Sequence, residues 1–386
     1  MLPTVRLIFL ITLLVQSSFQ EEEETSYLRF CGFKSGINVC YTHPVEALKA
    51  PFVWPAGSPT LRYVDLVGVT VAESSHQLFV DLLSTANRMD VYGGKVPTIY
   101  QVASVDKFVV SNSSTRRWIL EDDREYMATE VFFNQNPLEA VPANVGRLKR
   151  TTEISLADAA LKVLNMSAFD GLDQMVFLTF INNIVSLKVI TPIVVNMAGL
   201  RQFYCHQCSI SELDVSKWNM PSLKCLSLVK NPLTSVPKGL SKLKKLQILE
   251  AYGNKIQTLR MDDFKGLDHL TTLSLEENQL TKIVVQQPLS IKALRFVELQ
   301  TNKLLDASVL NQVDLPGLAV LNFADNNLTR FDATPRWKKL EYLNLDRNPL
   351  DCNWAVKEAV NPQSKVENIK QIKESCWKPV FVKINT

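Results

Sequence analysis

Glycine and histidine are scarce in this chain of 386 residues, which has 13 glycines and 4 histidines. A protein built on glycine-rich phosphate-binding loops is therefore not favoured, because such loops need several glycines close together. The four histidines are scattered, so no histidine-rich metal cluster can form, and no motif places a nucleophile beside a base. Neither sign of charge dominates, since 42 basic residues face 39 acidic ones, and a nucleic-acid-binding surface is not expected. We therefore predict no cofactor and no enzymatic activity.

Long apolar runs are also missing, apart from one short stretch near the N-terminus. Leu7 to Val15 follows Arg6 and precedes small polar residues, which is typical of a secretory signal peptide over residues 1–20. No later stretch reaches 18 apolar residues. We expect a secreted, extracellular chain that does not insert into a membrane. Three N-x-S/T sequons, expected to carry glycans in that compartment, begin at Asn112, Asn165 and Asn327.

One pattern recurs through the second half of the chain: apolar-x-x-apolar-x-apolar-x-x-Asn-x-apolar. Six copies begin at Leu223, Leu246, Leu270, Leu294, Leu318 and Leu340, 22 to 24 residues apart. Weaker copies with similar spacing begin at residues 61, 86, 105, 128, 151, 175 and 200. Fixed spacing of this kind indicates a repeat architecture in which each copy packs on the next.

Each copy predicts a short strand followed by a turn. Apolar side chains at positions 4 and 6 alternate with outward ones and enter a shared interior. The asparagine at position 9 is expected to turn inward and bond free backbone groups of its own and adjacent coils, as for Asn231, Asn254 and Asn278. Stacked strands then form a parallel sheet on the concave side. Return segments cover the convex side, with a helical or 3₁₀ turn around Phe264 and Leu267.

This pattern resembles the leucine-rich repeat. The resemblance implies an α/β horseshoe solenoid of about thirteen coils with a parallel concave sheet and capped ends. The domain organisation that we predict is a signal peptide over 1–20, an N-terminal cap over 21–60, repeats over 61–350, and a C-terminal cap and tail over 351–386.

The seven cysteines divide into cap and interior positions. Cys31 and Cys40 precede the first coil, while Cys352 and Cys376 follow the last, so each end is expected to be closed by one disulfide. Cys205 and Cys208 point inward in the repeat register, which favours buried thiols over a redox or metal site, with a disulfide involving one of them as the alternative. Cys225 falls on the outward face. We expect an exposed thiol there that forms an intermolecular disulfide, or else a partly covered thiol or a pair with Cys208.

Outward positions 3, 5 and 7 of the concave strands carry large apolar side chains beside acidic ones. Such a combination is typical of protein interfaces, although scattered apolar surface groups are also normal. Phe177 and Tyr204 are expected to be neighbours, and a charge introduced at either is expected to weaken partner binding. Glu250 and Glu298 favour a basic patch on the partner. The candidate partner-binding residues are Phe132, Phe177, Ile181, Tyr204, Glu250, Phe296, Glu298 and Tyr342.

The irregular early coils, the paired-cysteine ends and the close NPLDCNW (348–354) resemble the mosquito leucine-rich repeat immune proteins. That resemblance implies a circulating innate-immune recognition or scaffold factor whose partner is a complement-like thioester protein. The chain ends about ten residues after Cys376, without the coiled coil of longer members, so an oligomer would not form through heptads. A developmental or neuronal adhesion or guidance ligand is the alternative function. An enzyme or a protease inhibitor is not expected.

Overall fold

The structure is a computed structural model of the chain. It describes residues 27–34, 37–44, 47–49, 60–71, 75–83, 86–121, 124–183, 186–331 and 337–351, together with Phe52 and Asn353. Side chains are described from Ala47 onward within these ranges, except at Thr60 and Leu61. The predicted signal peptide, Cys352 and Cys376 lie outside the described residues.

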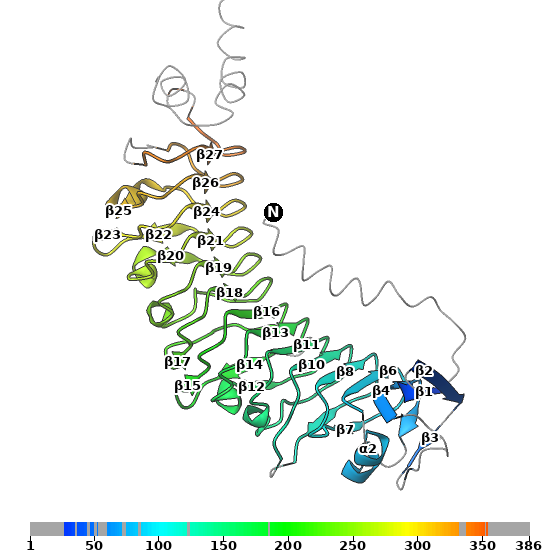
Figure 1. Cartoon of the computed structure of the whole chain (residues 1–386). Helices are drawn as coiled ribbons and strands as arrows, with labels where there is room; N and C mark the ends of the chain where they lie inside the picture. Colours follow the sequence, from blue (N-terminus) through cyan, green and yellow to red (C-terminus); the bar gives the residue numbers. More distant parts are fainter. Residues whose placement is uncertain are drawn as a thin grey trace, which may run out of the picture.

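A curved sheet of 15 strands lines the inner side of the molecule (Figure 1). Two of them, β1 (Tyr27–Lys34) and β2 (Ile37–Pro44), pair antiparallel at one edge, and the other thirteen are parallel. Each parallel strand overlaps one copy of the sequence template, so the expected parallel solenoid is confirmed. The parallel strands are β4 (Thr60–Val67), β6 (Arg88–Tyr92), β8 (Lys107–Ser111), β10 (Glu130–Asn134), β11 (Glu153–Ala157), β13 (Phe177–Ile181), β16 (Gln202–His206), β18 (Cys225–Ser227), β19 (Ile248–Glu250), β21 (Thr272–Ser274), β24 (Phe296–Glu298), β26 (Val320–Asn322) and β27 (Tyr342–Asn344).

A left-handed turn follows every one of these parallel strands. The eighth template position has a positive φ in all thirteen copies, whether or not glycine occupies it. Gly253 adopts its φ of 68° without strain. Lys230 and Glu277, each with a φ of 53°, adopt it as non-glycine residues at a cost of about 1 kcal/mol each. The turn comes just before the ninth position, whose side chain lies in the interior.

The return segments lie on the outer side of the curve (Figure 1). The 3₁₀ turn expected near Phe264 is present as η4 (Met261–Phe264). Other helical turns are α2 (His76–Leu82), η1 (Val145–Arg147), η2 (Met166–Phe169), η3 (Leu240–Lys242) and η5 (Ser308–Gln312). Two-stranded parallel ladders join successive return segments: β3 (Ala47–Leu48) with β5 (Thr70–Val71), β7 (Thr98–Tyr100) with β9 (Arg117–Ile119), β12 (Val163–Asn165) with β14 (Lys188–Ile190), β15 (Val195–Asn196) with β17 (Trp218–Asn219), β20 (Thr258–Arg260) with β22 (Lys282–Val284), and β23 (Leu289–Ser290) with β25 (Val313–Asp314).

One apolar interior runs through the stacked coils. Its middle is aromatic: the ring of Phe203 lies 6.0 Å from that of Phe180 and 5.0 Å from that of Trp218. A coil cannot bury such side chains alone, and its neighbours complete the packing on both sides. None of the helices that the structure describes is long and apolar enough to cross a membrane.

Asparagines form the predicted ladder along this interior. Asn254 Nδ2 donates to the carbonyl oxygens of Ala251 at 3.0 Å and of Leu228, in the preceding coil, at 3.0 Å. Its Oδ1 accepts from the amide of Leu233 at 3.1 Å. The side chains of Asn231, Asn278, Asn302 and Asn326 are equally buried and make the same set of bonds. The inward orientation of this position is therefore confirmed.

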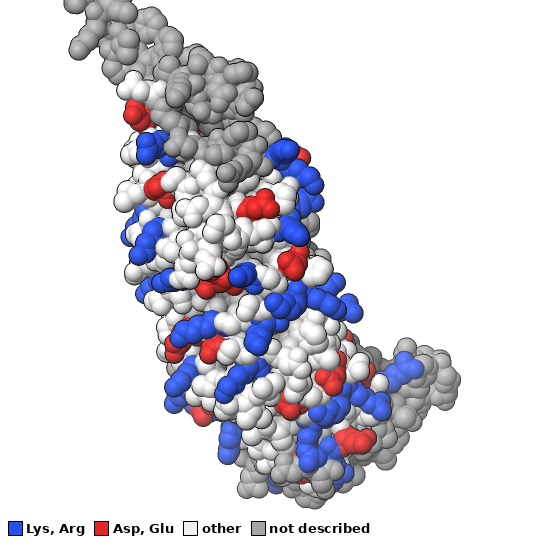
Figure 2. Space-filling view, turned by 90° about the vertical axis from the view of Figure 1, so that its left-hand side faces the viewer, with Lys and Arg blue, Asp and Glu red and all other residues white. Residues whose placement is uncertain are grey.

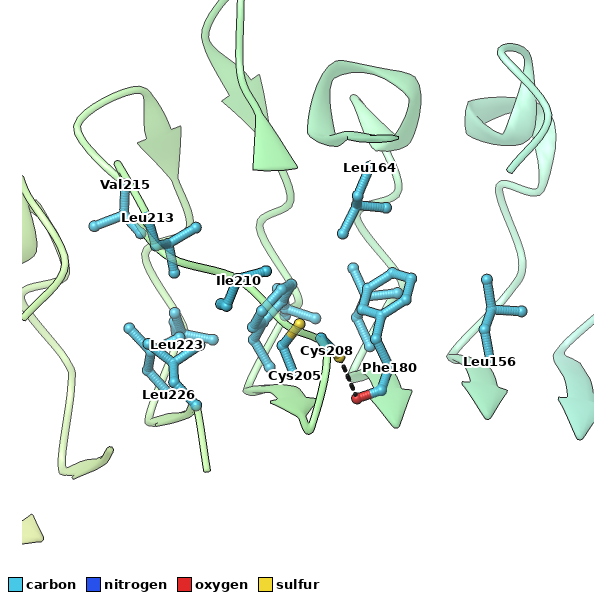
Figure 3. Packing of buried hydrophobic residues seen from close by; sticks show 14 of the residues in the cluster. Leu156, Leu164, Phe180, Cys205, Cys208, Ile210, Leu213, Val215, Leu223 and Leu226 are labelled. Carbon is cyan, nitrogen blue, oxygen red and sulfur yellow. Dashed lines mark hydrogen bonds between the residues drawn. The ribbon is translucent and has the colours of Figure 1, made fainter. Parts of the chain in front are cut away.

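Cys208 occupies the asparagine position of its coil (Figure 3). Its thiol donates to the carbonyl oxygens of Phe180 and His206, at 3.4 Å each. Cys205 and Cys208 are both fully buried and unpaired, which confirms the prediction of buried thiols. The carbonyl of Phe180 lies in the preceding coil, at the position to which the asparagines of other coils donate. The thiol makes a weaker hydrogen bond to it than an amide would.

We predict that Cys208→Asn raises the free energy of unfolding by about 1 kcal/mol, because an amide would restore stronger hydrogen bonds at this position. The same substitution three residues earlier, Cys205→Asn, is the control. It should destabilise the chain by about 2 kcal/mol or more, because position 6 offers the amide an apolar environment. Urea denaturation of the two variants measures both effects. A loss of stability in Cys208→Asn would show that this coil does not accept the ladder.

The N-terminal edge of the sheet is covered by the β1–β2 hairpin. In it Cys31 pairs in register with Cys40, and β1 pairs antiparallel with β4. Directly opposed residues of an antiparallel pair have Cα atoms about 4.5–5.5 Å apart, which suits a disulfide. The Cys31–Cys40 disulfide stays a prediction, as do the domain boundaries and the Cys352–Cys376 disulfide.

Candidate binding face

The outward side chains of the concave strands form rows that run along the solenoid. Near the C-terminal end, Phe296 pairs in register with Val320, and Val320 with Tyr342. All three are half-buried, so each leaves part of its apolar surface accessible. The guanidinium of Arg295 lies 5.5 Å from the centroid of the Phe296 ring. The predicted apolar line of this region is therefore continuous, and we call Phe296, Val320 and Tyr342 the C-terminal row.

A second apolar group lies on the middle coils. Phe177 and Ile181 occupy the two ends of β13, and both are half-buried. Phe132, on β10, is half-buried as well, and the Lys107 ammonium lies 5.3 Å from its ring centroid. Lys107 also pairs with Glu130 at 2.5 Å. The strands of Phe132 and Phe177 are separated by β11, which presents Glu153 and Ser155 outward.

Two residues expected on the open surface are buried instead. Tyr204 is 5% exposed and Cys225 is 8% exposed. The prediction that Tyr204 is an exposed anchor is therefore wrong. At Cys225 the structure agrees with the alternative of a covered thiol rather than with an exposed one. The Tyr204 hydroxyl donates to Gln202, and its ring meets that of His206 edge-on at 5.5 Å. Neighbouring strands lie only about 4.8 Å apart, so large side chains cover smaller ones on the same face.

The burial of Cys225 also changes its chemistry. Burial raises the pKa of its thiol to about 12, and the nearby Glu250 carboxylate adds to this rise. The thiolate is the reactive form of cysteine, so this thiol is unreactive at neutral pH. The structure records Cys225 as a free thiol. The prediction of an intermolecular disulfide at Cys225 required an exposed thiol, and the thiol is buried.

A hydrogen-bonded chain crosses three strands beside Cys225, and no sequence motif indicated it. His206 Nε2 lies 2.7 Å from Ser227 Oγ, and Ser227 Oγ donates to Glu250 Oε2 at 2.7 Å. Burial lowers the pKa of His206 to about 4, so its imidazole is neutral at physiological pH. Ser227 is fully buried, and a buried hydroxyl cannot attack a substrate. His206 holds position 7 of its copy of the template, and Ser227 and Glu250 hold position 5 of the next two copies. Only a comparison of these positions between adjacent coils would have predicted their contact.

Carboxylates gather between the hydrogen-bonded residues His206, Ser227 and Glu250 and the C-terminal row. Burial is the main reason that the pKa of Glu276 is raised, and the nearby Glu298 and Glu250 carboxylates raise it further. Burial likewise raises the pKa of Glu298. Glu276 Oε2 accepts from the hydroxyl of Ser274 at 2.6 Å. A cationic partner group would relieve the repulsion among these carboxylates.

The three predicted glycosylation sites are all exposed. Asn112 lies in the turn after β8, Asn165 ends β12, and Asn327 follows the buried Asn326. Each position leaves room for a glycan outside the interior. Glycosylation itself stays a prediction.

A family model for the leucine rich repeat matches residues 221–280. The solenoid is built of leucine-rich repeats. The matched part covers three of the regular copies, from Leu223 to Leu280, in which position 9 holds asparagine throughout.

Sequence relatives share these repeats over part of the chain. Human leucine-rich repeat-containing protein 66 is 37% identical over 109 residues, which are 28% of this chain and 12% of that protein. Mouse keratocan is 28% identical over 155 residues, covering 33% of this chain and 43% of keratocan. The chain thus spans less than half the length of either relative.

The leucine-rich repeat domain of LRIM1 aligns with a TM-score of 0.47 and 16% identity, over 67% of this chain and 77% of that domain.

Proposed function

We propose that this protein is an extracellular, non-enzymatic leucine-rich repeat protein that holds a protein partner on its concave face. The observation that carries the proposal is the C-terminal row, which is continuous, partly accessible and bordered by carboxylates. Interfaces combine accessible aromatic side chains at their centre with charged groups around them. The partner surface that fits best is apolar with a basic margin.

An innate-immune recognition or scaffold role is the specific function that we propose. It is supported by the resemblance of the coils and of the NPLDCNW close to the mosquito immune proteins, which also suggests a complement-like thioester protein as the partner. An extracellular location is supported by the N-terminal apolar segment and by the three exposed sequons. Induction of expression by microbial challenge tests the role. Expression confined to development would favour an adhesion ligand instead.

The concave face can be tested by adding charge to the C-terminal row. In Phe296→Asp and Tyr342→Asp, partner capture from native extracellular fluid is expected to fall at least tenfold, because a carboxylate would be buried against an apolar partner surface beside other acids. Quantitative mass spectrometry of captured proteins measures the effect. The binding role of Phe132, Phe177 and Ile181 is tested in the same way. That of Glu250 and Glu298 is tested by replacing each carboxylate with the neutral amide of glutamine.

Leu305→Asp is the matched control, because Leu305 is 65% exposed and lies outside the concave strands. It should capture as much partner as the parent chain. All variants should keep the parent circular dichroism spectrum. Equal capture by Phe296→Asp, Tyr342→Asp and the parent would reject the concave face as the binding surface.

A further inference from the structure

One stretch of the chain carries charge of a single sign. Between Asp214 and Glu250, residues 215–249 contain seven lysines and no other charged residue. The overall charge of the chain is close to balance, so this excess of positive charge is confined to one stretch. All seven lysines are exposed. Among the described residues, none of them forms a salt bridge with a carboxylate. Hydrogen bonds from Ser216 lower the pKa of the Asp214 carboxyl group, and the nearby Lys238 and Lys217 lower it further.

Most of these lysines lie on one return segment of the solenoid. Lys238, Lys242, Lys244 and Lys245 surround η3 on the outer side, and Lys217 lies beside β17 on the preceding coil. Lys224 directly precedes β18 and its backbone bonds into the concave sheet, so it is not part of this group. We call the other five residues the lysine band. Lys and Arg gather across the middle of this outer face (Figure 2).

Two lysines of the band are fixed by backbone groups. Lys217 Nζ donates to the carbonyl oxygen of Pro192 at 2.6 Å, and Lys244 Nζ donates to that of Gly266 at 3.4 Å. A carbonyl oxygen orients an ammonium group without neutralising it. The band therefore presents several positive charges, some of them held in place, on two adjacent coils.

Acidic residues border the band on both neighbouring coils. Glu212 and Asp214 precede it, and Asp262, Asp263 and Asp268 follow on the next coil. A broad anionic surface such as a membrane would meet these acids as well as the lysines and would be repelled by them. A single narrow polyanion lying along the η3 return segment would meet Lys238, Lys242, Lys244 and Lys245, with Asp214 at its edge beside Lys238.

The residue types of the band narrow the choice of polyanion. Single-stranded nucleic acid binds by stacking its bases on aromatic side chains. The single aromatic residue of 215–249 is Trp218, which is 3% exposed and packs on Phe203. The band also has no arginine, the residue that binds phosphate groups bidentately. Lysine ammonium groups act as point charges that suit sulfate groups spaced along a flexible chain.

We propose that the lysine band is a binding site for a linear sulfated polysaccharide. The site lies on the outer side of the solenoid, opposite the concave face. A protein partner and a polysaccharide could therefore be held at the same time, and loss of either binding would leave the other intact.

The test is binding of the full chain to immobilised heparin at several salt concentrations. The band variant replaces Lys238, Lys242 and Lys245 with glutamine, which spares the two lysines that bond backbone carbonyls. The control variant replaces Lys188, Lys282 and Lys292 with glutamine; these are exposed lysines on other coils, so the control removes the same charge. We expect at least a tenfold weaker affinity for the band variant and less than a twofold change for the control. The salt dependence of binding should weaken by about one counterion for each band lysine removed.

Several outcomes would overturn the proposal. Equal losses in both variants would show that net charge alone governs binding, and unchanged affinity in the band variant would place the site elsewhere. Tighter binding to vesicles containing phosphatidylserine, or to single-stranded DNA of equal charge, would assign the band to another polyanion. Equal binding of fully desulfated heparin would remove the role of sulfate. Both variants should melt within a few degrees of the parent chain.

Discussion

Replacing Asn326 with alanine is expected to lower the free energy of unfolding by about 3 kcal/mol, because the side chain bonds two coils to each other. Asn326 Nδ2 donates to the carbonyl oxygens of Leu299 at 2.9 Å and of Phe323 at 3.0 Å, and its Oδ1 accepts from the amide of Leu304 at 3.0 Å. Alanine would leave these backbone groups buried without partners. Urea denaturation followed by circular dichroism measures the loss.

The adjacent residue is the matched control. Asn327 has the same chemistry but is exposed, and its backbone amide, which donates to the carbonyl oxygen of Leu304 at 3.0 Å, is kept in alanine. Asn327→Ala should therefore change the free energy of unfolding by less than about 0.5 kcal/mol. Both proteins should be made without glycans, because Asn327 begins a sequon. Similar losses at the two positions would contradict an inward ladder.

Phe180→Ala is expected to cost about 4 kcal/mol of stability, the largest effect of any single substitution considered. Phe180 is fully buried, and its ring lies 6.4 Å from that of Phe169 and 6.0 Å from that of Phe203. Removing it leaves a cavity that the stacked coils on both sides cannot close, since each backbone is held by its neighbours. The measurement is the urea midpoint and the slope of the transition.

Phe177→Ala provides the comparison within the same strand. Phe177 lies three residues earlier on β13 and is half-buried on the outward face. Its loss should cost about 1 kcal/mol, in keeping with the smaller apolar area that it buries. If the two substitutions cost the same, the assignment of inward and outward positions on β13 would be wrong.

The regular coils were predictable because the same local requirement repeats in each of them. Leu226 and Leu228 enter the interior and Asn231 bonds free carbonyls, as the template indicates. Even the irregular copies, such as that at residues 86–96, have their strand and left-handed turn at the expected positions. The spacing within one copy is therefore sufficient to predict the strand, the turn and the buried side chain.

The concave surface was predicted less well, and Tyr204 and Cys225 show why. The template identifies them as outward, and outward positions were equated with exposure. Both are buried because Gln202, His206 and Glu250 lie beside them on the same face. Tyr204 is covered in part by neighbours on its own strand, and Cys225 lies beside Tyr204 and Glu250 of the adjacent coils. The template gives the direction of a side chain but not the size of the side chains around it.

The sequence by itself determined the architecture: how many coils stack, which residues fill the interior, and that the asparagines turn inward. These features follow from a pattern that every coil repeats, so local chemistry is sufficient. The tertiary structure decided the antiparallel hairpin that covers the first coil, the burial of Tyr204 and Cys225, the His206–Ser227–Glu250 chain and the arrangement of the lysine band. Each of these depends on which strands and side chains lie next to one another in space, because those neighbours set burial, charge and hydrogen bonding and the template does not contain them.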